Sequence, residues 1–567
     1  MSGSCQAAIA GVMLRWQTTG SASMATDKAA ANHPQELVDY NLFTTHPALV
    51  DAVAAECPPG AAETLSQIGA RLGTAEMFAL GDAANRNPPV LKAFNRFGER
   101  CDEVEFHPAW HELMRRLVAE GLHTGPWAEP VPGAHVTRAT AYMLWAEIEN
   151  GTQCPATMTY GAVPVLARQS KDFADWLPRL LSREYDPGSI PISQKRGALI
   201  GMGMTEKQGG SDVRSNISRA VPVGASGTGR EYRLAGHKWF LSVPSSDAFL
   251  LLAQAPGGLS CFFVPRILPD GTRNGLRFQR LKDKLGNRSN ASSEVEFEDT
   301  IGVLIGEEGR GVPTIIEMGV YTRLDNAIGT TGIMHQCVAQ AIHHARHRSA
   351  FGRLLIDQPL MQNVLADLAL ECEAAIFLTL RLARAFDAQD DELESALRRV
   401  LTPVAKYWIC KRGPVVAAEA MEVLGGNGYV EEGPIARRFR EMPLNSIWEG
   451  SGNIMCLDVL RALSREPRTR DALASLLQGS RNADERYDRY VSQLLTDLAD
   501  PNDIERRARL LTQNIALAVQ AGLLIARCSP AAEAFLASRI AVGAPGAFGT
   551  LPAGVPLQPL IDRALSP

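Results

Sequence analysis

The sequence lacks paired cysteines, an apolar run of membrane length and a recognisable secretion signal. Its ten cysteines are scattered from Cys5 to Cys528 without a C-x-x-C pair, which argues against a disulfide framework and a thiolate metal site. The longest apolar stretches, such as 515–525, have the length of a core helix rather than of a membrane span. The short apolar segment 7–14 has no basic flank before it and no clear cleavage site. We therefore expect a cytoplasmic protein with no membrane partner and no bound metal.

The spacing of apolar residues divides the chain into five regions. Residues 1–34 are rich in Ala, Ser and Thr with few charges, and we expect a disordered extension there. Helical patterns broken by turn signals occupy 35–190, whereas short runs of β-branched and aromatic residues occupy 191–305. Long helical segments rich in Ala and Leu return over 306–463, and 464–567 continue as a further helical stretch. The pattern predicts an α+β chain with a helical domain, a β-barrel or sandwich, a helix bundle and an extra C-terminal helical domain.

A lone carboxylate, Glu449, stands in the octapeptide S-I-W-E-G-S-G-N, residues 446–453. An exposed Glu titrates near ~4.3, but burial beside an aromatic ring disfavours the charged form and raises the pKa. Such a carboxylate can remove a weakly acidic carbon-bound proton. The small residues after it let a planar ligand approach the backbone, and free N–H groups at a helix start favour electron-rich oxygens. On these eight residues alone, a Glu that only stabilises a helix dipole fits as well as a catalytic base.

Two further segments favour the catalytic interpretation. They are M-G-M-T-E-K-Q-G-G-S-D-V at 202–213 and G-H-K-W-F-L-S at 236–242. Together with the octapeptide, they resemble the acyl-CoA dehydrogenase superfamily, whose patterns are a T-E-x-x-x-G-S-D loop, a G-x-K-x-aromatic-x-Thr/Ser strand and an E-G-Ser/Thr turn. Within it, the run K-D-K-L-G-N-R-S-N-A-S at 282–292 is most similar to the alkylation-response flavoproteins. The resemblance covers residues 35–540 and implies a four-helix bundle after the β domain.

The resemblance implies FAD as the cofactor and assigns its contacts. Thr205 and Ser211 would hydrogen-bond the flavin ring and the pyrophosphate, Phe240 would cover the ring, and Ser242 would bond near N5. Hydroxyl and backbone donors stabilise the negative charge of a reduced flavin and of phosphate oxygens. The FAD-binding residues predicted from these three segments are Met202, Gly203, Met204, Thr205, Gly209, Gly210, Ser211, Phe240, Leu241, Ser242, Trp448, Ser451 and Asn453.

Two other segments imply that FAD is shared between subunits. R-S-A-F-G at 348–352 matches the family's R-x-x-F-G, in which the Arg contacts pyrophosphate and the Phe packs near the adenosine of a neighbouring subunit's cofactor. This assigns Arg348 and Phe351. M-E-V-L-G-G-N-G at 421–428 matches a Q-x-x-G-G-x-G run, except that a Glu, a less favourable neighbour for phosphate, replaces the Gln. The resemblance adds Glu422, Gly425 and Gly426 to the FAD site and implies a homotetramer.

The resemblance also implies a reaction. Glu449 would take the α-proton of an acyl-CoA thioester while the β-hydrogen leaves as a hydride to flavin N5. Arg323 matches a family Arg close to the base, and it either tunes the charge of the base or pairs with Asp325; we favour the structural role. The resemblance to the alkylation-response type implies only weak oxidation of branched short-chain acyl-CoA. The sequence identifies neither the physiological acyl chain nor the electron acceptor.

Residues 464–567 continue where a simple acyl-CoA dehydrogenase would end. They hold twelve Arg, no Lys and eleven Asp plus Glu, a net charge of +1, whereas the remaining 463 residues carry a net charge of −6. The resemblance implies a helical extension whose basic surface binds double-stranded DNA, which requires several phosphates to be neutralised together. The predicted DNA-binding residues are Arg481, Arg486, Arg489, Arg506, Arg507 and Arg509. Exposed helix arginines paired with acids are the alternative. The stretch 543–559, rich in Gly and Pro, is expected to be an irregular tail.

Three functions from different classes remain open at this point. The first is a flavoprotein of the alkylation response that binds duplex DNA and retains a weak acyl-CoA dehydrogenase site. The second is a metabolic dehydrogenase of a short or branched acyl-CoA, with no DNA role. The third is a flavin-bearing scaffold without turnover, against which the retained Glu449 argues. We rank the first highest.

Overall fold

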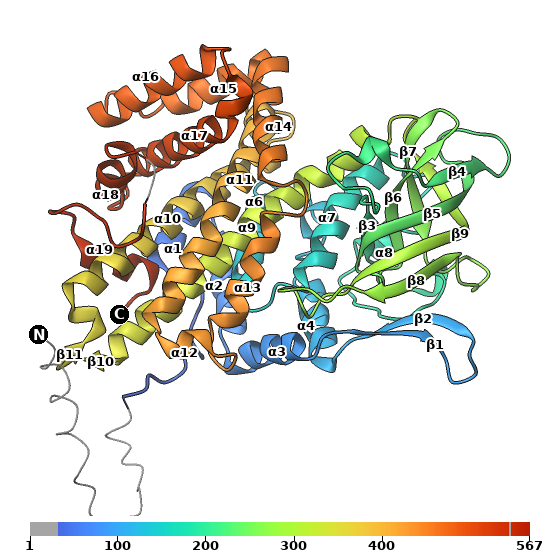
Figure 1. Cartoon of the computed structure of the whole chain (residues 1–567), viewed down its shortest axis with the longest axis horizontal. Helices are drawn as coiled ribbons and strands as arrows, with labels where there is room; N and C mark the ends of the chain where they lie inside the picture. Colours follow the sequence, from blue (N-terminus) through green and yellow to red (C-terminus); the bar gives the residue numbers. More distant parts are fainter. Residues whose placement is uncertain (1–31, 544–545) are drawn as a thin grey trace, which may run out of the picture.

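A computed structural model describes residues 32–543 and 546–567, and Figure 1 shows its regions in chain order. The first region is helical because its apolar residues recur at helical spacing, as in the buried row Leu65, Ile68 and Leu72. Its helices are α1 (Pro47–Glu56), α2 (Ala61–Leu72), α3 (Ala75–Arg86), α4 (Pro108–Ala119), α5 (Gly125–Ala128), α6 (Ala134–Ala146), α7 (Gln153–Ala167) and α8 (Leu177–Leu180).

A β-hairpin interrupts this helical region, which the sequence did not predict. Strands β1 (Val90–Phe94) and β2 (Arg100–Glu105) pair antiparallel, and Gly98, at φ +80°, forms their turn. The sequence signal is weak because each strand has at most six residues, and the only buried residue of the hairpin is the polar Asp102. The hairpin reaches towards the β domain (Figure 1), where Arg100 donates a hydrogen bond of 2.8 Å to the carbonyl of Phe278.

The second region is a β domain whose seven main strands pair in the order β3-β5-β4-β6-β7-β9-β8. Additional pairings between β3 and β6 and between β5 and β9 curl this sheet towards a barrel. Its elements are the 3-10 turns at Ile192–Gln194 and Val213–Ser215 and the strands β3 (Ile200–Gly203), β4 (Arg219–Pro222), β5 (Glu231–Ser242), β6 (Ala248–Ala255), β7 (Gly258–Pro265), β8 (Leu276–Leu281) and β9 (Ser292–Ile305).

The central strand β6 is buried on both faces. Phe249 and Leu251 pack inside the barrel, whereas Leu250 and Leu252 belong to a second apolar cluster that includes residues of α7 and of the first bundle helix. This arrangement explains the unbroken apolar sequence of the strand, because a strand covered on both sides does not alternate. The second cluster fixes the β domain against the helices and so determines where the site between them lies.

The third region is a bundle of long helices. Three of them, of 37, 29 and 32 residues, pack against one another around an apolar core that also includes the N-terminal helices. The elements are α9 (Gly311–His347), β10 (Ser349–Ala350), β11 (Arg353–Leu354), a 3-10 turn at Leu355–Asp357, α10 (Pro359–Asp387), α11 (Glu392–Val423), α12 (Gly426–Tyr429), α13 (Ala436–Asn445) and α14 (Gly452–Arg465). The expected fold class, α+β with this order of domains, is confirmed.

The C-terminal extension is helical and packs on the bundle at the side away from the β domain (Figure 1). Its elements are α15 (Pro467–Gln478), α16 (Glu485–Ala499), α17 (Ile504–Ala526), α18 (Ala532–Phe535), a π-helical turn at Leu536–Ile540 and α19 (Leu557–Ala564). By length and composition alone, α17 could cross a membrane, but 72% of its most apolar window is buried inside the fold. Helix α17 is thus a core helix of the extension.

As expected for 543–559, the described residues before Leu557 form no helix or strand, but this stretch packs against the core. Phe548 and Leu551 are buried in the main core, and α19 starts at Leu557, inside the stretch expected to be irregular. Arg563 forms an ion pair of 2.8 Å with Glu373 of α10. The prolines at 552, 556 and 559 made helix α19 hard to predict, since they interrupt the helical pattern although they are compatible with a turn and a helix start.

The expected disordered extension at 1–34 mostly lies outside the described residues, which begin at Asn32. Asn32 itself is held by the end of α9: its side chain donates to the carbonyl of Ser349 and accepts from the Ser349 N–H at 2.8 Å. The side chain of Arg348 donates to the Asn32 carbonyl. These contacts place Asn32 beside the end of α9, and the expectation of a disordered extension stays a prediction.

Candidate functional site

The first two flavin segments lie side by side because their strands pair. Met202 of β3 faces Ser242 of β5 in an antiparallel register, and Trp239 donates a backbone hydrogen bond of 2.8 Å to Thr205. Met202, Gly203 and Leu241 are buried, whereas Thr205 and Ser242 are partly exposed. The register thus brings together the predicted ring-binding residues of both segments.

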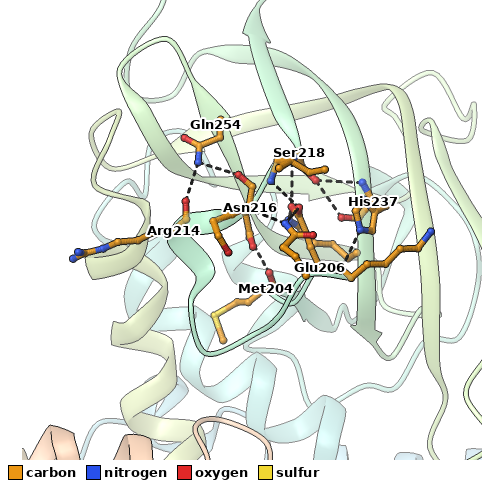
Figure 2. Close-up of polar contacts among 12 residues, drawn as sticks. Met204, Glu206, Arg214, Asn216, Ser218, His237 and Gln254 are labelled. Atoms are coloured by element: carbon orange, nitrogen blue, oxygen red, sulfur yellow. Dashed lines mark hydrogen bonds and ion pairs between the residues drawn. The ribbon is translucent and has the colours of Figure 1, made fainter.

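The loop at 204–212, which contains Thr205 and Ser211, is here called the flavin loop. Side chains behind it hold it in place, as Figure 2 shows. Asn216 donates to the carbonyl of Met204 at 2.9 Å, and Gln254 donates to the carbonyl of Asn216 at 3.0 Å. Ser218 donates to the carbonyl of His237 at 3.1 Å and thereby joins the loop to β5. The loop is therefore fixed by side-chain bonds where regular pairing ends.

Glu206, the residue after Thr205, anchors the same loop from inside the β domain. Its carboxylate lies 2.6 Å from Nζ of Lys238, and both side chains are fully buried. Burial raises the pKa of Glu206, but the charge of Lys238 and the N–H group of Ile217 outweigh it and lower the pKa to about 2. Removing either partner of such a pair leaves an uncompensated buried charge. The Glu and Lys of the two motifs thus form one structural unit.

The surface next to this loop fits a flavin nucleotide. Phe240 is an exposed aromatic at 45%, next to Ser242, and Gly210 lies where a Cβ would come within 2.5 Å of Thr205 Oγ1. A cavity of about 1270 Å³ begins at Ser211 and continues between α9, α11, α14 and α15. An apolar ring face, hydroxyl donors and a close backbone approach are the features that FAD requires. These residues could hold the cofactor.

Glu449 occupies a strained backbone position between α13 and α14. Its φ is +57°, in the left-handed region that costs a non-glycine residue about 1–2 kcal/mol. Gly450 follows at φ +108°, and a Cβ there would lie 2.5 Å from the methyl group of Met455. The tight turn explains why a glycine follows the carboxylate. It also projects Glu449 from the gap between two helices towards α9.

The carboxylate of Glu449 is partly buried and hydrogen-bonded. Thr322 of α9 donates its hydroxyl proton to Glu449 Oε2 at 2.7 Å. Burial raises the pKa of Glu449 above its ordinary value, while the Thr322 bond and the charges of Arg323 and Lys406 partly oppose this. A carboxylate with a raised pKa, held by one hydroxyl, is suited to accept a proton from carbon.

Two cations hold the backbone on either side of Glu449. Arg323 donates to the carbonyl of Glu449 at 2.9 Å, and Lys406 of α11 donates to the carbonyls of Trp448, at 2.9 Å, and Gly450. Burial lowers the pKa of Lys406 to about 8. Lys406 was missed by the sequence analysis, although a lone Lys within the apolar run L-T-P-V-A-K-Y-W-I-C is itself a signal of a buried role.

The suggested pairing of Arg323 with Asp325 is wrong. Residues two apart on a helix do not face each other. Arg323 pairs instead with Asp458 of α14 at 3.0 Å, and Asp325 pairs with Arg138 of α6 at 2.8 Å. The favoured structural role for Arg323 is nevertheless present, because the side chain ties α9 to α14 and to the backbone of Glu449.

The residues around Glu449 that were predicted to bind FAD have distinct surroundings. Trp448 donates its indole N–H to Asn445 at 3.0 Å, and Ser451 is the N-cap residue of α14. Asn453 is exposed and accepts a hydrogen bond of 2.8 Å from Arg509 of α17. Arg509, predicted to bind DNA, therefore contacts a predicted cofactor residue.

The remaining predicted FAD residues are not close to Glu449 in the same chain. Arg348 follows the end of α9, 26 residues beyond Thr322, which corresponds to about 39 Å along the helix. Phe351 is 96% exposed. The exposed residues Glu422, Gly425 and Gly426 follow or end α11, with Gly425 at φ +60°. Arg348 is thus well separated from Glu449 along α9.

The predicted DNA-binding arginines differ in how far their charges are neutralised. Arg486 pairs with Asp484 and Glu533 at 2.7 and 2.6 Å, and Arg507 donates to the carbonyls of Asp497, Asp500 and Asn502. Arg481 bonds Ser492 at 3.0 Å and lies 3.6 Å from Asp488. Arg489 and Arg506 are the most available, being exposed with only long contacts of 3.4 and 3.9 Å.

The described part of the chain shows no grouping of three His, Cys, Asp or Glu side chains suited to a metal ion. Its nine cysteines are free thiols.

Comparison with known proteins agrees with this geometry. The adaptive response protein AidB N-terminal domain matches residues 32–187, the acyl-CoA dehydrogenase middle domain matches 201–300, and the acyl-CoA dehydrogenase C-terminal domain matches 309–464. AidB of Escherichia coli (strain K12) is 51% identical over 86% of this chain and 89% of AidB.

Solved structures share the fold. ACDH-11 of Caenorhabditis elegans, in complex with C11-CoA, superposes with a TM-score of 0.83 at 25% identity and covers 94% of this chain and 95% of its own. An acyl-CoA dehydrogenase of Bacillus anthracis complexed with FAD gives a TM-score of 0.60 at 20% identity over 76% of this chain and 77% of its own. The chain belongs to the AidB-like acyl-CoA dehydrogenases, a family of FAD-dependent oxidoreductases.

Proposed function

We propose that this chain acts in the cytoplasm in the adaptive response to DNA alkylation, where it binds duplex DNA and retains a weak acyl-CoA dehydrogenase activity. The observation that carries the proposal is the 51% identity to AidB, together with the match to an adaptive-response domain over residues 32–187. The chain covers 89% of that relative, so the comparison includes most of its length.

The dehydrogenase part of the proposal rests on the geometry around Glu449. FAD, when bound, supplies the hydride acceptor of the reaction. Glu449 takes the α-proton of the acyl thioester onto its carboxylate, whose raised pKa favours proton uptake. Thr322 orients the carboxylate, and Lys406 and Arg323 fix the backbone that carries it. The proton and the hydride thus leave neighbouring carbons of the substrate.

The DNA-binding part rests on the extension. Duplex DNA is bound mainly through phosphates, and each contact requires a cation that no protein acid already neutralises. Arg489 of α16 meets this condition, and Arg506 of α17 has only a long, exposed contact of 3.9 Å to Asp503; the two helices pack against each other. Residues 464–567 carry a net charge of +1, whereas the remaining residues carry −6. The extension therefore repels phosphates less than the rest of the chain does.

We propose further that the active form is a homotetramer in which FAD is shared. Arg348 and Phe351 lie about 39 Å along α9 from the residue that binds Glu449, too far to contact the cofactor of their own chain. The exposure of Phe351 at the tip between β10 and β11 supports insertion into a neighbouring subunit. Asn32, which binds Arg348, would border the same interface.

A metabolic dehydrogenase of a short or branched acyl-CoA, with no DNA role, is the second candidate. The observation in its favour is that Arg486 and Arg507 are already satisfied within the extension, as structural arginines are. In this case the extension would serve only packing and oligomerisation.

A titration of the FAD-loaded protein with a labelled DNA duplex, followed by anisotropy at low and moderate salt, separates the two candidates. DNA binding predicts an affinity that falls steeply with salt, with a slope of about −0.9 per phosphate neutralised. No binding even at low salt would favour the metabolic dehydrogenase.

A further inference from the structure

A bulge in strand β5 places two consecutive aromatic side chains, Trp239 and Phe240, on the outside of the β domain. The pairing of β5 with β9 shifts its register between Lys238 and Leu241, and these two flanking side chains are buried. Consecutive residues of a regular strand point to opposite faces, whereas the extra residue of a bulge redirects a side chain. Trp239 is half-buried and Phe240 is exposed. The bulge thus presents an aromatic pair where Phe240 is expected to cover the flavin ring.

The side chain of Lys282, which follows β8, packs on this aromatic pair. Its ammonium group lies 3.4 Å from the ring centre of Trp239 and 4.7 Å from that of Phe240. A cation over an aromatic face is attracted by the electrons of the ring, most strongly where water is excluded. Only 12% of the Lys282 side chain is exposed, so its surroundings are mostly protein. Lys282 therefore holds both rings at one defined point.

Two further contacts fix Lys282 in this position. Its backbone N–H donates to the carbonyl of Ser292 at 2.8 Å, and Ser292 lies opposite Ser242 in the β5–β9 register. Its Nζ lies 2.6 Å from a carboxylate oxygen of Glu294, to which Arg280 also donates at 2.7 Å. Burial acts to raise the pKa of Glu294, but the two cations outweigh it and lower the pKa, so the carboxylate stays charged.

Cations outnumber acids around the aromatic pair. The ammonium of Lys207, in the flavin loop, lies 5.7 Å from the ring centre of Trp239, and the guanidinium carbon of Arg280 lies 5.9 Å from it. Together with Lys282, three cations from separate parts of the β domain face one carboxylate, that of Glu294, which leaves a net charge of +2. Such charges are screened less in a partly buried site than at an open surface.

A positive potential at this place favours the reduced state of FAD. Reduction by the substrate transfers a hydride, that is two electrons and one proton, and the flavin ring gains one negative charge. Opposite charges attract more strongly in a partly buried site than in water. The expected ring contacts Thr205 and Ser242 lie in the same segments as Lys207 and Trp239, so the cations are close to the expected position of the ring.

We propose that Lys282 is a positioning residue of the flavin site, which fixes Phe240 against the flavin ring and raises the reduction potential of FAD through its charge. The inference rests on the proposed placing of the ring against Phe240 and Ser242, and it is independent of DNA binding. Lys282 and Glu294 then act with opposite sign, since the cation stabilises the reduced flavin and the carboxylate destabilises it. A purely structural role would give changes of one sign, because loss of either partner would loosen the same rings.

The reduction potential of the FAD-loaded protein tests the inference without any acyl-CoA. Xanthine with xanthine oxidase supplies the electrons anaerobically, and absorbance follows the flavin against a reference dye. We expect Lys282→Met, which keeps an unbranched side chain on the rings, to shift the equilibrium about fivefold towards oxidised FAD, or about 20 mV for a two-electron couple. Lys282→Arg should restore the wild-type potential, and Glu294→Gln should raise it. Lys92→Met, which breaks an exposed ion pair with Glu105 on the hairpin, is the matched control and should leave the potential unchanged.

The contrary outcomes are distinct from one another. An unchanged or raised potential in Lys282→Met, or a lowered one in Glu294→Gln, would overturn the charge effect. Phe240→Leu tests the placing of the ring, because loss of a stacked aromatic should change the visible absorbance of bound FAD; an unchanged spectrum would contradict that placing. Failure of acyl-CoA to reduce the flavin of the wild-type protein would contradict the dehydrogenase part of the proposed function and leave the measured potentials valid.

Discussion

Charges are held in opposite ways in the catalytic corner, defined here as Glu449 with Thr322, Arg323 and Lys406, and in the C-terminal extension. In the catalytic corner, Thr322, Arg323 and Lys406 each donate to a specific atom of Glu449 or of its chain neighbours, although they lie on elements far apart in the sequence. In the extension, by contrast, Arg481 and Arg507 bond groups close to them in the sequence, and Arg506 extends into solvent at 85% exposure. Surface ion pairs contribute only about 0–1 kcal/mol, whereas breaking a buried polar arrangement costs several times more.

This difference teaches where single substitutions should matter. In the proposed mechanism the chemistry depends on one carboxylate with few partners, so removing a single group should abolish or strongly slow it. DNA affinity would be the sum of several weak contacts and should decline gradually. The following predictions are ordered by the size of the expected effect.

The largest effect is expected for Glu449→Gln, which removes the base without changing its size. Substrate-driven flavin reduction should slow by about 10²–10⁴-fold, the usual contribution of a general base. Anaerobic stopped-flow absorbance measures it. Glu505→Gln, an exposed Glu on α17, is the matched control and should react at the normal rate. Unchanged flavin reduction in Glu449→Gln would show that another group removes the proton.

Thr322→Val should slow the reaction by about 10–100-fold at neutral pH, because it removes a hydrogen bond to a charged group. The Thr322 bond lowers the pKa of Glu449, which burial has raised. Without it the pKa rises further, the reactive carboxylate forms at higher pH, and the rising limb of the pH–rate profile moves upwards. Thr322→Ser keeps a hydroxyl and should restore the profile. A profile that does not move in Thr322→Val would contradict the assigned role.

The double substitution Arg489→Gln with Arg506→Gln tests the extension. Losing two phosphate contacts should lower DNA affinity about tenfold and reduce the salt slope by about 2. Arg486→Gln is the matched control, since two carboxylates already neutralise that charge, and it should bind DNA normally. The reverse ranking of these variants would place the DNA surface elsewhere.

The smallest effect is expected for Arg509→Gln, which tests whether this residue of the extension acts in the FAD site or on the DNA surface. Arg509 belongs to the extension but bonds Asn453 at the start of α14. Loss of this bond should weaken FAD retention a few-fold, in line with about 0.5–1.5 kcal/mol for one hydrogen bond. Equilibrium dialysis measures FAD retention, with Arg506→Gln as the control. A loss of DNA affinity with normal FAD retention would return Arg509 to the DNA surface.

The features that could be predicted from the sequence are those formed by short runs of contiguous residues. Glu449 with its glycine, and the loop and strand that contain Thr205 and Ser242, are local patterns whose order also indicates the fold. The partners of Glu449 are not local, since Thr322 is 127 positions away from it. Only the packing of α9 and α11 against the turn makes them neighbours.

The two missed elements of the fold have a different cause. The β1–β2 hairpin is short and its only buried residue, Asp102, is polar, so it lacks the apolar alternation by which strands are detected. Helix α19 has eight residues and starts next to prolines, and its stability comes from contacts such as Arg563 with Glu373. Both elements form because of tertiary packing, which no local sequence pattern indicates.

The central claim, that one chain combines a buried proton-abstracting site with a separate DNA surface, has one direct test. FAD-loaded wild-type protein and Glu449→Gln would each be titrated with labelled duplex DNA, and flavin reduction by acyl-CoA would be recorded on the same samples. The account predicts the same DNA affinity and salt dependence for both proteins, with flavin reduction lost only in Glu449→Gln. DNA affinity absent from both proteins, or lost together with flavin reduction, would contradict it.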